Sequence, residues 1–208
     1  VMRFEPYPHQ RAGIDWILEN KACGLFWSMG LGKSVTTLTA IDLLLNDYLE
    51  EGPVLIIAPK RVAENTWTGE AQKWDHLKHL RVRQIMGDRN ARVDAVIDAL
   101  GPSPAEIYVI NRENVQWLCN ELKGRWPFPI VVIDELSSFK SRAAKRWQAL
   151  RRVRGRIKRI IGLTGTPRPN GLEDLWPEIY LLDHGERLGK TLGTFRQRYS
   201  VSCPLTIV

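Results

Sequence analysis

A glycine-rich segment between an apolar run and a helix-forming stretch constrains this chain more than any other feature. Gly30 and Gly32 follow the apolar residues 25–27 and are followed at once by Lys33 and Ser34. Glycines at this spacing let the backbone turn so that several N–H groups point at one anion. A helix that begins at the same place adds the positive end of its dipole. The segment therefore predicts a strand, a tight phosphate-binding loop and a helix N-terminus, in that order.

The residue types of this loop predict how the phosphates of a nucleotide would be held. Lys33 would reach the β- and γ-phosphates, and the Ser34 hydroxyl would take a place on Mg²⁺. The complete pattern has a glycine where this chain has Trp27, so an ordinary glycine-rich turn is the alternative interpretation. The residues expected to contact the nucleotide here are Met29, Gly30, Leu31, Gly32, Lys33 and Ser34.

Composition limits the class of protein. With 208 residues the chain can form one α/β domain with a sizeable core, or one domain with an appendage. Hydrophobic residues make up 44% and charged residues 25%, as in ordinary soluble globular proteins. No apolar run approaches the roughly 20 residues of a bilayer span, and no secretory signal opens the chain. The net charge of +7 favours a polyanionic partner, although many basic proteins bind no nucleic acid.

Cysteine usage points to a cellular compartment. Cys23, Cys119 and Cys203 lie far apart in the sequence, with no paired spacing. A sparse and odd set of cysteines indicates reduced thiols rather than a disulfide framework or a zinc site. We therefore expect a protein of a reducing compartment, which is the cytoplasm if the source is a bacterium or a phage in its host, and the nucleus if the source is eukaryotic.

Apolar runs of strand length alternate with helical patterns along most of the chain. The expected strands are 23–27, 54–58, 82–86, 107–110, 130–133 and 156–163. The expected helices include 10–18, 35–48, 65–74, 88–100 and 188–199. This alternation predicts the α/β class, with a parallel sheet covered by helices on both faces and hence three layers.

Polar clusters stand at the carboxyl ends of five of these strands, where the ligands of parallel sheets bind. The clusters are 27–33, 59–60, 111–112, 134–135 and 164–167. Beside a phosphate loop, Asp134 would hold Mg²⁺ through its water shell, and Glu135 would polarise the attacking water. The alternative for this acidic pair is a turn with a helix cap.

Gln10 and two tryptophans each admit two interpretations. The Gln10 amide could read the edge of a purine because it donates and accepts together, but a solvated glutamine at a helix start is preferred. Trp67 and Trp74 stand at helical spacing on one face, so they are assigned to the core rather than to base stacking.

Two other features also have a functional and a structural interpretation. His76 and His79 share a helical face but lack a carboxylate or cysteine partner in register, so a solvated pair is preferred to a metal site. The basic run 151–159 could contact phosphates, or it could be the exposed end of a helix and the start of a strand. The solvated interpretation of this run is preferred.

Several of these segments together resemble a known family. Residues 29–34, 134–135 and 163–167 look like motifs I, II and III of superfamily 2 helicase-like ATPases, and more narrowly of Swi/Snf-type DNA translocases. The third motif is the most specific, because the tail that follows it in the family is present here as Asn170 and then 172–176.

The resemblance runs from about residue 7 to about residue 200. Gln10 matches the position of the family's adenine-contacting glutamine. Motif Ia and the helix behind it are matched by Pro59, followed by Trp67, Glu70 and Trp74. Residues 110–113 are similar to motif Ib. The fold that the resemblance implies is a RecA-like P-loop NTPase, with 1–185 as the ATP-binding first lobe. Residues 186–208 would be a helical extension leading to an absent second lobe.

The resemblance also implies roles for individual residues. Lys33, Asp134 and Glu135 would be catalytic, with Ser34 and Asp134 on the metal. Thr164, Gly165 and Thr166, with Ser137, would couple the nucleotide state to DNA. Lys60, Asn111 and Arg112 would lie near the phosphate backbone of one strand, giving salt-sensitive binding without sequence preference.

Two positions depart from the family pattern. Ser137 stands where the family usually has histidine; a serine can bridge to motif III by a hydrogen bond but cannot carry a positive charge. Trp27 and Ser28 replace an acidic pair that often precedes motif I in the family, which would alter the rim of the nucleotide site.

The function implied by the resemblance is that of the first lobe of an ATP-dependent translocase on double-stranded DNA. Its partners would be ATP, Mg²⁺, DNA and a second RecA-like lobe, and no membrane. A strand-separating helicase of restriction or replication type is the second hypothesis. A nucleotide-gated DNA-binding module without hydrolysis is the third, favoured only by Ser137. A small-molecule P-loop kinase is a weak fourth, since nothing resembles its lid or acceptor site.

Overall fold

The computed structural model describes residues 2–166 and 172–199, and within them the apolar runs become the strands of one sheet. The strands are β1 (Ala22–Leu25), β2 (Val54–Ala58), β3 (Val82–Gln84), β4 (Ile107–Asn111), β5 (Ile130–Asp134) and β6 (Arg159–Leu163). Their order across the sheet is β1-β6-β5-β2-β4-β3, and every neighbouring pair is parallel. The parallel sheet expected from the sequence is therefore confirmed.

Successive residues of the central strands face two separate cores. Leu55 and Ile57 of β2 belong to one cluster of buried apolar side chains, whereas Val54, Ile56 and Ala58 belong to the other. The division arises because successive side chains of a strand point to opposite faces of the sheet. Since β2, β4 and β6 are buried along their whole length, both faces must be covered.

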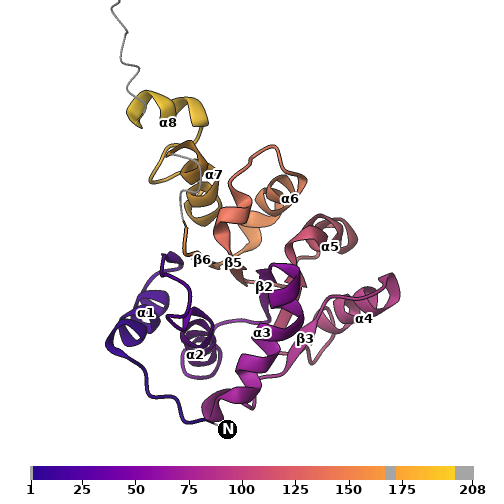
Figure 1. Ribbon diagram of the computed structural model, residues 1–208. Helices are drawn as coiled ribbons and strands as arrows, with labels where there is room; N and C mark the ends of the chain where they lie inside the picture. The colour runs from indigo at the N-terminus through magenta and orange to yellow at the C-terminus, as the bar shows by residue number, and fades with distance from the viewer. Residues whose placement is uncertain (1, 167–171, 200–208) are drawn as a thin grey trace, which may run out of the picture.

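Helices provide that cover on both faces (Figure 1). The core that contains Val54 also contains side chains of α1 (Pro8–Glu19), α2 (Lys33–Asn46) and α3 (Lys60–Lys73). The core that contains Leu55 contains side chains of α4 (Arg89–Ala99), α5 (Val115–Leu122), α6 (Lys145–Val153), α7 (Leu172–Asp183) and α8 (Leu192–Tyr199). Short 3-10 helices are η1 (Asp75–Leu77), η2 (Arg112–Asn114), η3 (Leu136–Phe139) and η4 (Arg154–Arg156). The three-layer α/β arrangement is thus the one predicted.

Three elements begin three or more residues away from the sequence prediction. Helix α3 begins at Lys60 rather than at 65, because the extended Pro59 ends β2 and serves as the N-cap. Strand β6 begins at Arg159 rather than at 156, because η4 occupies the residues before it. Helix α8 begins at Leu192 rather than at 188, because Gly189 has φ +96 and interrupts a helical backbone.

The basic run 151–159 is only partly solvated. Arg154 donates hydrogen bonds to backbone carbonyls at the end of α7. Arg159 donates to backbone carbonyls at the end of α1 and to the Glu50 carboxylate, 2.6 Å from Nη2. Carbonyls at a helix C-terminus lack intrahelical partners, so a buried guanidinium can satisfy them. The two side chains are only 7% and 3% exposed, so the solvated interpretation was wrong for both.

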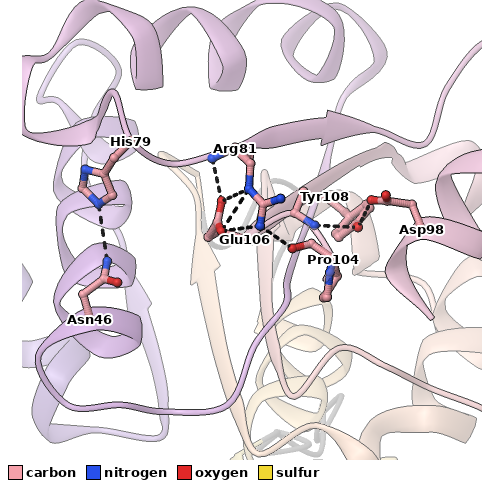
Figure 2. A network of polar contacts seen from close by, with 8 residues as sticks. Asn46, His79, Arg81, Asp98, Pro104, Glu106 and Tyr108 are labelled. Carbon is pink, nitrogen blue, oxygen red and sulfur yellow. Dashed lines mark hydrogen bonds and ion pairs between the residues drawn. The ribbon is translucent and has the colours of Figure 1, made fainter. Parts of the chain in front are cut away.

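Polar contacts also tie the segment before β3 to its neighbours (Figure 2). Arg81 donates to the Glu106 carboxylate from Nη2 at 2.7 Å, and also to the carbonyl of Pro104. His79 Nε2 forms a hydrogen bond with Asp42 Oδ1, at 2.7 Å, on the neighbouring α2. These contacts fix the sheet edge near β3 to α2 and to the loop before β4.

The two described cysteines form no disulfide. Cys23 and Cys119 are free thiols whose pKa burial raises to about 11, and Cys203 lies outside the described residues. Over 2–166 and 172–199, no group of three or more histidine, cysteine or acidic side chains could hold a metal ion. None of the helices within those ranges is long and apolar enough to span a bilayer.

One buried acid on α7 lowers the stability of the fold at neutral pH. Glu178 is fully buried, and both of its carboxylate oxygens lack a hydrogen-bond partner. Burial raises its pKa to about 8, and the nearby charges of Asp174 and Glu135 add to the effect. The folded protein therefore keeps this proton at neutral pH, whereas the unfolded chain releases it near its ordinary value.

We predict that Glu178→Gln stabilises the protein in a pH-dependent way. Because the folded pKa is raised, the proton's contribution to stability is complete below the unfolded pKa and is lost as pH rises to about 8. Urea unfolding should show a gain of about 1 kcal/mol at pH 5 and of about 3 kcal/mol at pH 7. The exposed Glu186→Gln is the control, and an equal gain for Glu178→Gln at both pH values would contradict this account.

Candidate functional site

The loop between β1 and α2 adopts the conformation that its glycines predict. Gly30 has φ +84 and Gly32 has φ +76, and Gly32 is the N-cap of α2. Both values lie in the left-handed region, which glycine enters without the steric cost that other residues meet. The chain can therefore turn sharply from the strand end into the first turn of the helix, where unpaired N–H groups point outward.

Lys33 lies across this loop. Its Nζ donates to the backbone carbonyl of Trp27 at 2.8 Å and to that of Ser28 at 3.1 Å. The ammonium group is thus held inside the curve of the loop, beside the N-terminus of α2. Ser34 follows on the first turn of the helix and lines the same cavity. The loop consequently presents a cation, N–H donors and a hydroxyl on one side.

The start of α1 packs against the loop and buries Gln10. The Gln10 side chain is only 6% exposed; Oε1 accepts from the Tyr7 backbone N–H at 2.9 Å. Its Nε2 donates to the Leu31 carbonyl at 3.5 Å, and His9 Nε2 donates to the same carbonyl at 3.1 Å. The solvated interpretation of Gln10 was therefore wrong, because both the oxygen and the nitrogen of its buried amide form hydrogen bonds with backbone groups of residues that line the cavity.

The carboxyl end of β5 brings an acidic pair to the same cavity. Trp67 of α3 donates its indole N–H to Asp134 Oδ2 at 3.0 Å, which fixes the orientation of the carboxylate. Burial raises the pKa of Asp134, while the Trp67 hydrogen bond and the charge of Lys33 act in the opposite direction. The influence of Lys33 on this pKa agrees with their position in one cavity.

Glu135 connects the ends of β5 and β6. Its backbone is left-handed, with φ +60, which turns the side chain away from the strand direction. Its Oε1 accepts hydrogen bonds from the Ser137 hydroxyl and from the Thr164 hydroxyl, the latter at 2.7 Å. The Thr166 backbone N–H donates to Thr164 Oγ1 at 3.1 Å. Among the described residues, Ser137 is thus linked to the segment after β6 through the Glu135 carboxylate.

A cavity of about 780 Å³ collects most of the predicted site residues. Those that line it are Gln10, Met29, Gly30, Leu31, Gly32, Lys33, Ser34, Asp134 and Glu135. Carboxylate and hydroxyl oxygens at one end are the donor types that Mg²⁺ prefers, and the loop N–H groups and Lys33 suit phosphate oxygens. The chemistry of this lining therefore fits a nucleoside triphosphate with its metal ion.

Part of the cavity wall was missed by the sequence analysis. Residues 2–5 and Tyr7 line it, as do Glu70 of α3 and Trp74, the C-cap of that helix. Trp67 is fully buried, as predicted, but Trp74 is only half-buried and donates its indole N–H to Glu70 at 2.8 Å. The family resemblance did assign Glu70 and Trp74 to the motif Ia helix, and that was the available signal.

The residues expected along DNA lie outside the cavity, at the ends of β2 and β4. Lys60 is exposed at the start of α3, and Arg112 contacts Glu113 at 3.0 Å. The Asn111 side chain is buried and donates to Glu113 at 2.9 Å, so its amide is held inside the protein. Gly165 lies beside the phosphate loop, since a Cβ there would be 3.4 Å from the Trp27 carbonyl.

Some of the motif III tail lies outside the described residues. Pro167 and Asn170 belong to that part of the chain. The later part of the tail is the first turn of α7, where Lys140 Nζ lies 3.9 Å from Asp174. Trp176 of the same tail is buried and donates to the Gly189 carbonyl at 2.9 Å. These contacts tie the tail to η3 and to the start of the C-terminal segment.

Comparisons with known proteins agree with this geometry. The family model of the SNF2-related domain matches residues 9–203. Putative protein p41 of Acyrthosiphon pisum secondary endosymbiont phage 1 is 39% identical over 201 residues, covering 94% of this chain and 43% of that protein. The ISWI chromatin-remodeling complex ATPase ISW2 of Saccharomyces cerevisiae is 32% identical over 178 residues, covering 84% and 15%.

Solved structures match as well. The SWI2/SNF2 ATPase core of Sulfolobus solfataricus in complex with double-stranded DNA has a TM-score of 0.70 at 26% identity, covering 95% of this chain and 41% of that one. The ATPase core domain from the same organism gives 0.68 at 26% identity, covering 93% and 39%. The chain spans less than half the length of each of these proteins.

The two loop glycines should differ in their sensitivity to substitution. At both positions an alanine meets the cost of a positive φ, about 1 kcal/mol. At Gly32 the added Cβ would also lie 2.2 Å from Gln10 Nε2, whereas at Gly30 nothing lies within 4 Å. We therefore predict that Gly32→Ala lowers the free energy of unfolding by about 1 kcal/mol more than Gly30→Ala, because the bonds of Gln10 are lost.

Urea unfolding of both variants, each with and without Gln10→Ala, measures this difference. Combined with Gln10→Ala, Gly32→Ala should cost no more than Gly30→Ala. If the excess cost of Gly32→Ala survives in the Gln10→Ala background, the packing of Gln10 on the loop is not its cause.

Proposed function

Because the chain belongs to the SNF2-related domain family of ATPases, we propose that it is the ATP-binding lobe of a motor that moves along double-stranded DNA. The observation that carries this proposal is that Lys33, Ser34, Asp134 and Glu135 all line the same cavity. These side chains come from two separate segments of the sequence. An ordinary glycine-rich turn, the alternative interpretation of residues 29–34, does not explain why the acidic pair lies beside it.

ATP would bind with its phosphates on the loop and its base toward Gln10. The Lys33 ammonium donates hydrogen bonds to two loop carbonyls. When ATP binds, it would donate to oxygens of the β- and γ-phosphates instead. Ser34 and Asp134 would hold Mg²⁺, which supplies charge neutralisation on the phosphate oxygens when it is bound. The Trp67 hydrogen bond holds the Asp134 carboxylate in place for this role.

Glu135 would orient and activate the water that attacks the terminal phosphate. Its carboxylate is held by the hydroxyls of Ser137 and Thr164, so its position depends on the segment that follows β6. Thr164 in turn accepts from the Thr166 N–H. In this proposal a shift of that segment by DNA would move the carboxylate, and this is how Thr164, Gly165 and Thr166 would couple DNA to nucleotide.

DNA would bind along the carboxyl ends of the strands. The SWI2/SNF2 ATPase core of Sulfolobus solfataricus, which has a similar fold, is described in complex with double-stranded DNA. Lys60 is exposed at the end of β2, and Arg112 follows β4, so both can meet phosphates of one strand. Asn111, with its buried amide, would act by positioning Glu113 and Arg112.

The lobe would work together with a second lobe of the same general fold. The chain spans less than half the length of its relatives, which leaves room in them for a second sheet. In this division residues 1–185 form the ATP-binding lobe and 186–208 lead toward the second lobe, which would supply an arginine finger. The phage relative agrees with a motor that works in a bacterial cytoplasm.

Ser137 favours one competing function, a DNA-binding module gated by nucleotide without hydrolysis. Its hydroxyl and that of Thr164 both occupy Oε1 of Glu135, the proposed base. A carboxylate engaged in this way needs to be released, wholly or in part, before it can act on water. ATPase measurements therefore decide between the motor and the module.

Nucleotide binding provides a direct test of the site. We predict that isothermal titration of this chain with ATP shows binding that Mg²⁺ strengthens. Lys33→Ala should weaken the affinity at least tenfold, about 1.4 kcal/mol. Asp134→Asn should leave the Mg²⁺-free affinity unchanged but remove the gain from Mg²⁺. The exposed Lys21→Ala is the control, and a full Mg²⁺ effect in Asp134→Asn would contradict the assignment.

Hydrolysis tests the division into lobes. We predict that this chain alone hydrolyses ATP very slowly and without stimulation by duplex DNA, because an arginine finger contributes several powers of ten. The full-length protein should show stimulation by duplex DNA, and Glu135→Gln in it should abolish hydrolysis while ATP still binds. Vigorous DNA-stimulated turnover by the 208-residue chain would refute the two-lobe proposal. Strand displacement by the full-length protein would instead identify a helicase.

A further inference from the structure

The outward face of α6 is a surface of basic side chains fixed on a buried apolar base. Trp147 and Leu150 face the core, while Lys145, Arg151 and Arg152 are exposed. The imbalance extends beyond the helix, since residues 136–159 hold ten of the thirty Lys and Arg residues of the chain and no acidic residue.

Two grooves flank this face. The groove toward α5, of about 670 Å³, is lined by Gln116, Lys145, Gln148, Arg151 and Arg152. The groove toward α7 and α8, of about 510 Å³, is lined by Arg142, Gln148, Arg151, Lys190 and Thr191, together with the apolar side chains of Ala143, Trp147, Trp176 and Leu192. Neither lining, as far as the described residues define it, includes an acidic side chain. We call the face with its two grooves the α6 basic face.

The cations of this face lack the acidic partners that several other surface cations have. Among the described residues, none of its five cations forms an ion pair. These five are Arg142, Lys145, Arg151, Arg152 and Lys190. Elsewhere on the surface, cations such as Arg81, Arg83 and Arg196 are paired with carboxylates. The charge of the α6 basic face is therefore available to an external anion.

The face is also held in a fixed position. The Arg151 guanidinium lies 5.6 Å from the ring of Trp147 and 5.4 Å from that of Tyr180, which keeps it on the crest between the grooves. Arg146 donates to the Ser138 carbonyl at 2.9 Å, which ties the start of α6 to the segment after Glu135. A fixed cation loses less conformational entropy on binding than a mobile one.

The position of α6 separates it from the nucleotide cavity and joins it to the proposed DNA track. The helix packs in the core on the face of the sheet opposite α1, α2 and α3, whose residues line the cavity. It lies beside α5 (Figure 1) and contacts η2, which contains Arg112. Gln116, only four residues after Arg112, lines the groove toward α5.

We propose that the α6 basic face binds the phosphate backbone of duplex DNA beyond the contact at the strand ends, and so lengthens the DNA footprint of this lobe. This inference rests on the proposed function. A nucleic acid fits better than an acidic protein, because α6 carries no exposed large apolar side chain that could anchor a protein interface. Unpaired cations interleaved with glutamine amides suit a phosphate backbone read without sequence preference.

The experiment measures binding of this chain to a duplex of about 30 base pairs by fluorescence anisotropy over a series of salt concentrations. The test variant is Lys145→Gln/Arg151→Gln/Arg152→Gln, and the control, with the same change in net charge, is Lys21→Gln/Lys78→Gln/Arg89→Gln. We expect the slope of log K against log salt to fall by about 3 in the test variant only, since each phosphate contact contributes about 0.9.

Two further arms make the result decisive. Arg151→Lys, which keeps the charge, should retain the wild-type slope, and a duplex of about 10 base pairs should bind the test and control variants alike. Equal slopes for the test and control variants on the long duplex would overturn the inference. It would also be overturned if polyglutamate, and not DNA, lost affinity in the test variant.

A strand-end variant separates this inference from the function on which it rests. Lys60→Gln/Arg112→Gln should lower the slope on both duplex lengths. If it does so while the α6 variant behaves as the control, only the inference about α6 fails. If the wild-type chain binds neither duplex, the inference and the proposed DNA function fail together, while ATP titration still reports on the nucleotide site.

Discussion

The parallel register of β1, β6 and β5 is the constraint on which the candidate site depends. Leu25 pairs with Leu163, and Leu163 pairs with Asp134, so three strands end at one level. The phosphate loop, the segment from Thr164 and the acidic pair therefore leave the sheet side by side. A shift of one residue in the pairing of β5 with β6 would turn Asp134 to the opposite face and remove it from Lys33.

The sequence predicted the strands well because burial on both faces imposes a simple pattern. Runs such as 54–58 and 130–133 are continuously apolar, and only a strand covered on both sides tolerates this at such length. The buried arginines could not be predicted in this way. Arg154 and Arg159 are satisfied by carbonyls at the ends of helices far away in sequence, and charge patterning carries no information on such partners.

In the candidate site, too, local patterns could be predicted from the sequence, whereas contacts between residues distant in sequence could not. Glycine spacing, a lysine and an acidic pair at strand ends are local signals, and the structure brings those residues into one cavity. The Trp67–Asp134 hydrogen bond joins residues 67 positions apart, so only the packing of α3 on the sheet reveals it. Asn111 stands at the expected strand end, yet the buried direction of its side chain depends on Glu113 and Asn114, which periodicity does not resolve.

The sheet lies between the two proposed anion-binding regions, the nucleotide cavity and the α6 basic face, and its strand ends connect them. The nucleotide cavity is built from α1, α2 and α3 on one face, whereas the α6 basic face lies on the other. Between them, one carboxylate oxygen of Glu135 accepts from both Ser137 and Thr164, at the junction of β5 and β6. The segment after Glu135 is linked to α6 by a hydrogen bond, because Arg146 of α6 donates to the Ser138 carbonyl. A force on α6 from bound DNA therefore has a short covalent and hydrogen-bonded path to the residue proposed to activate water.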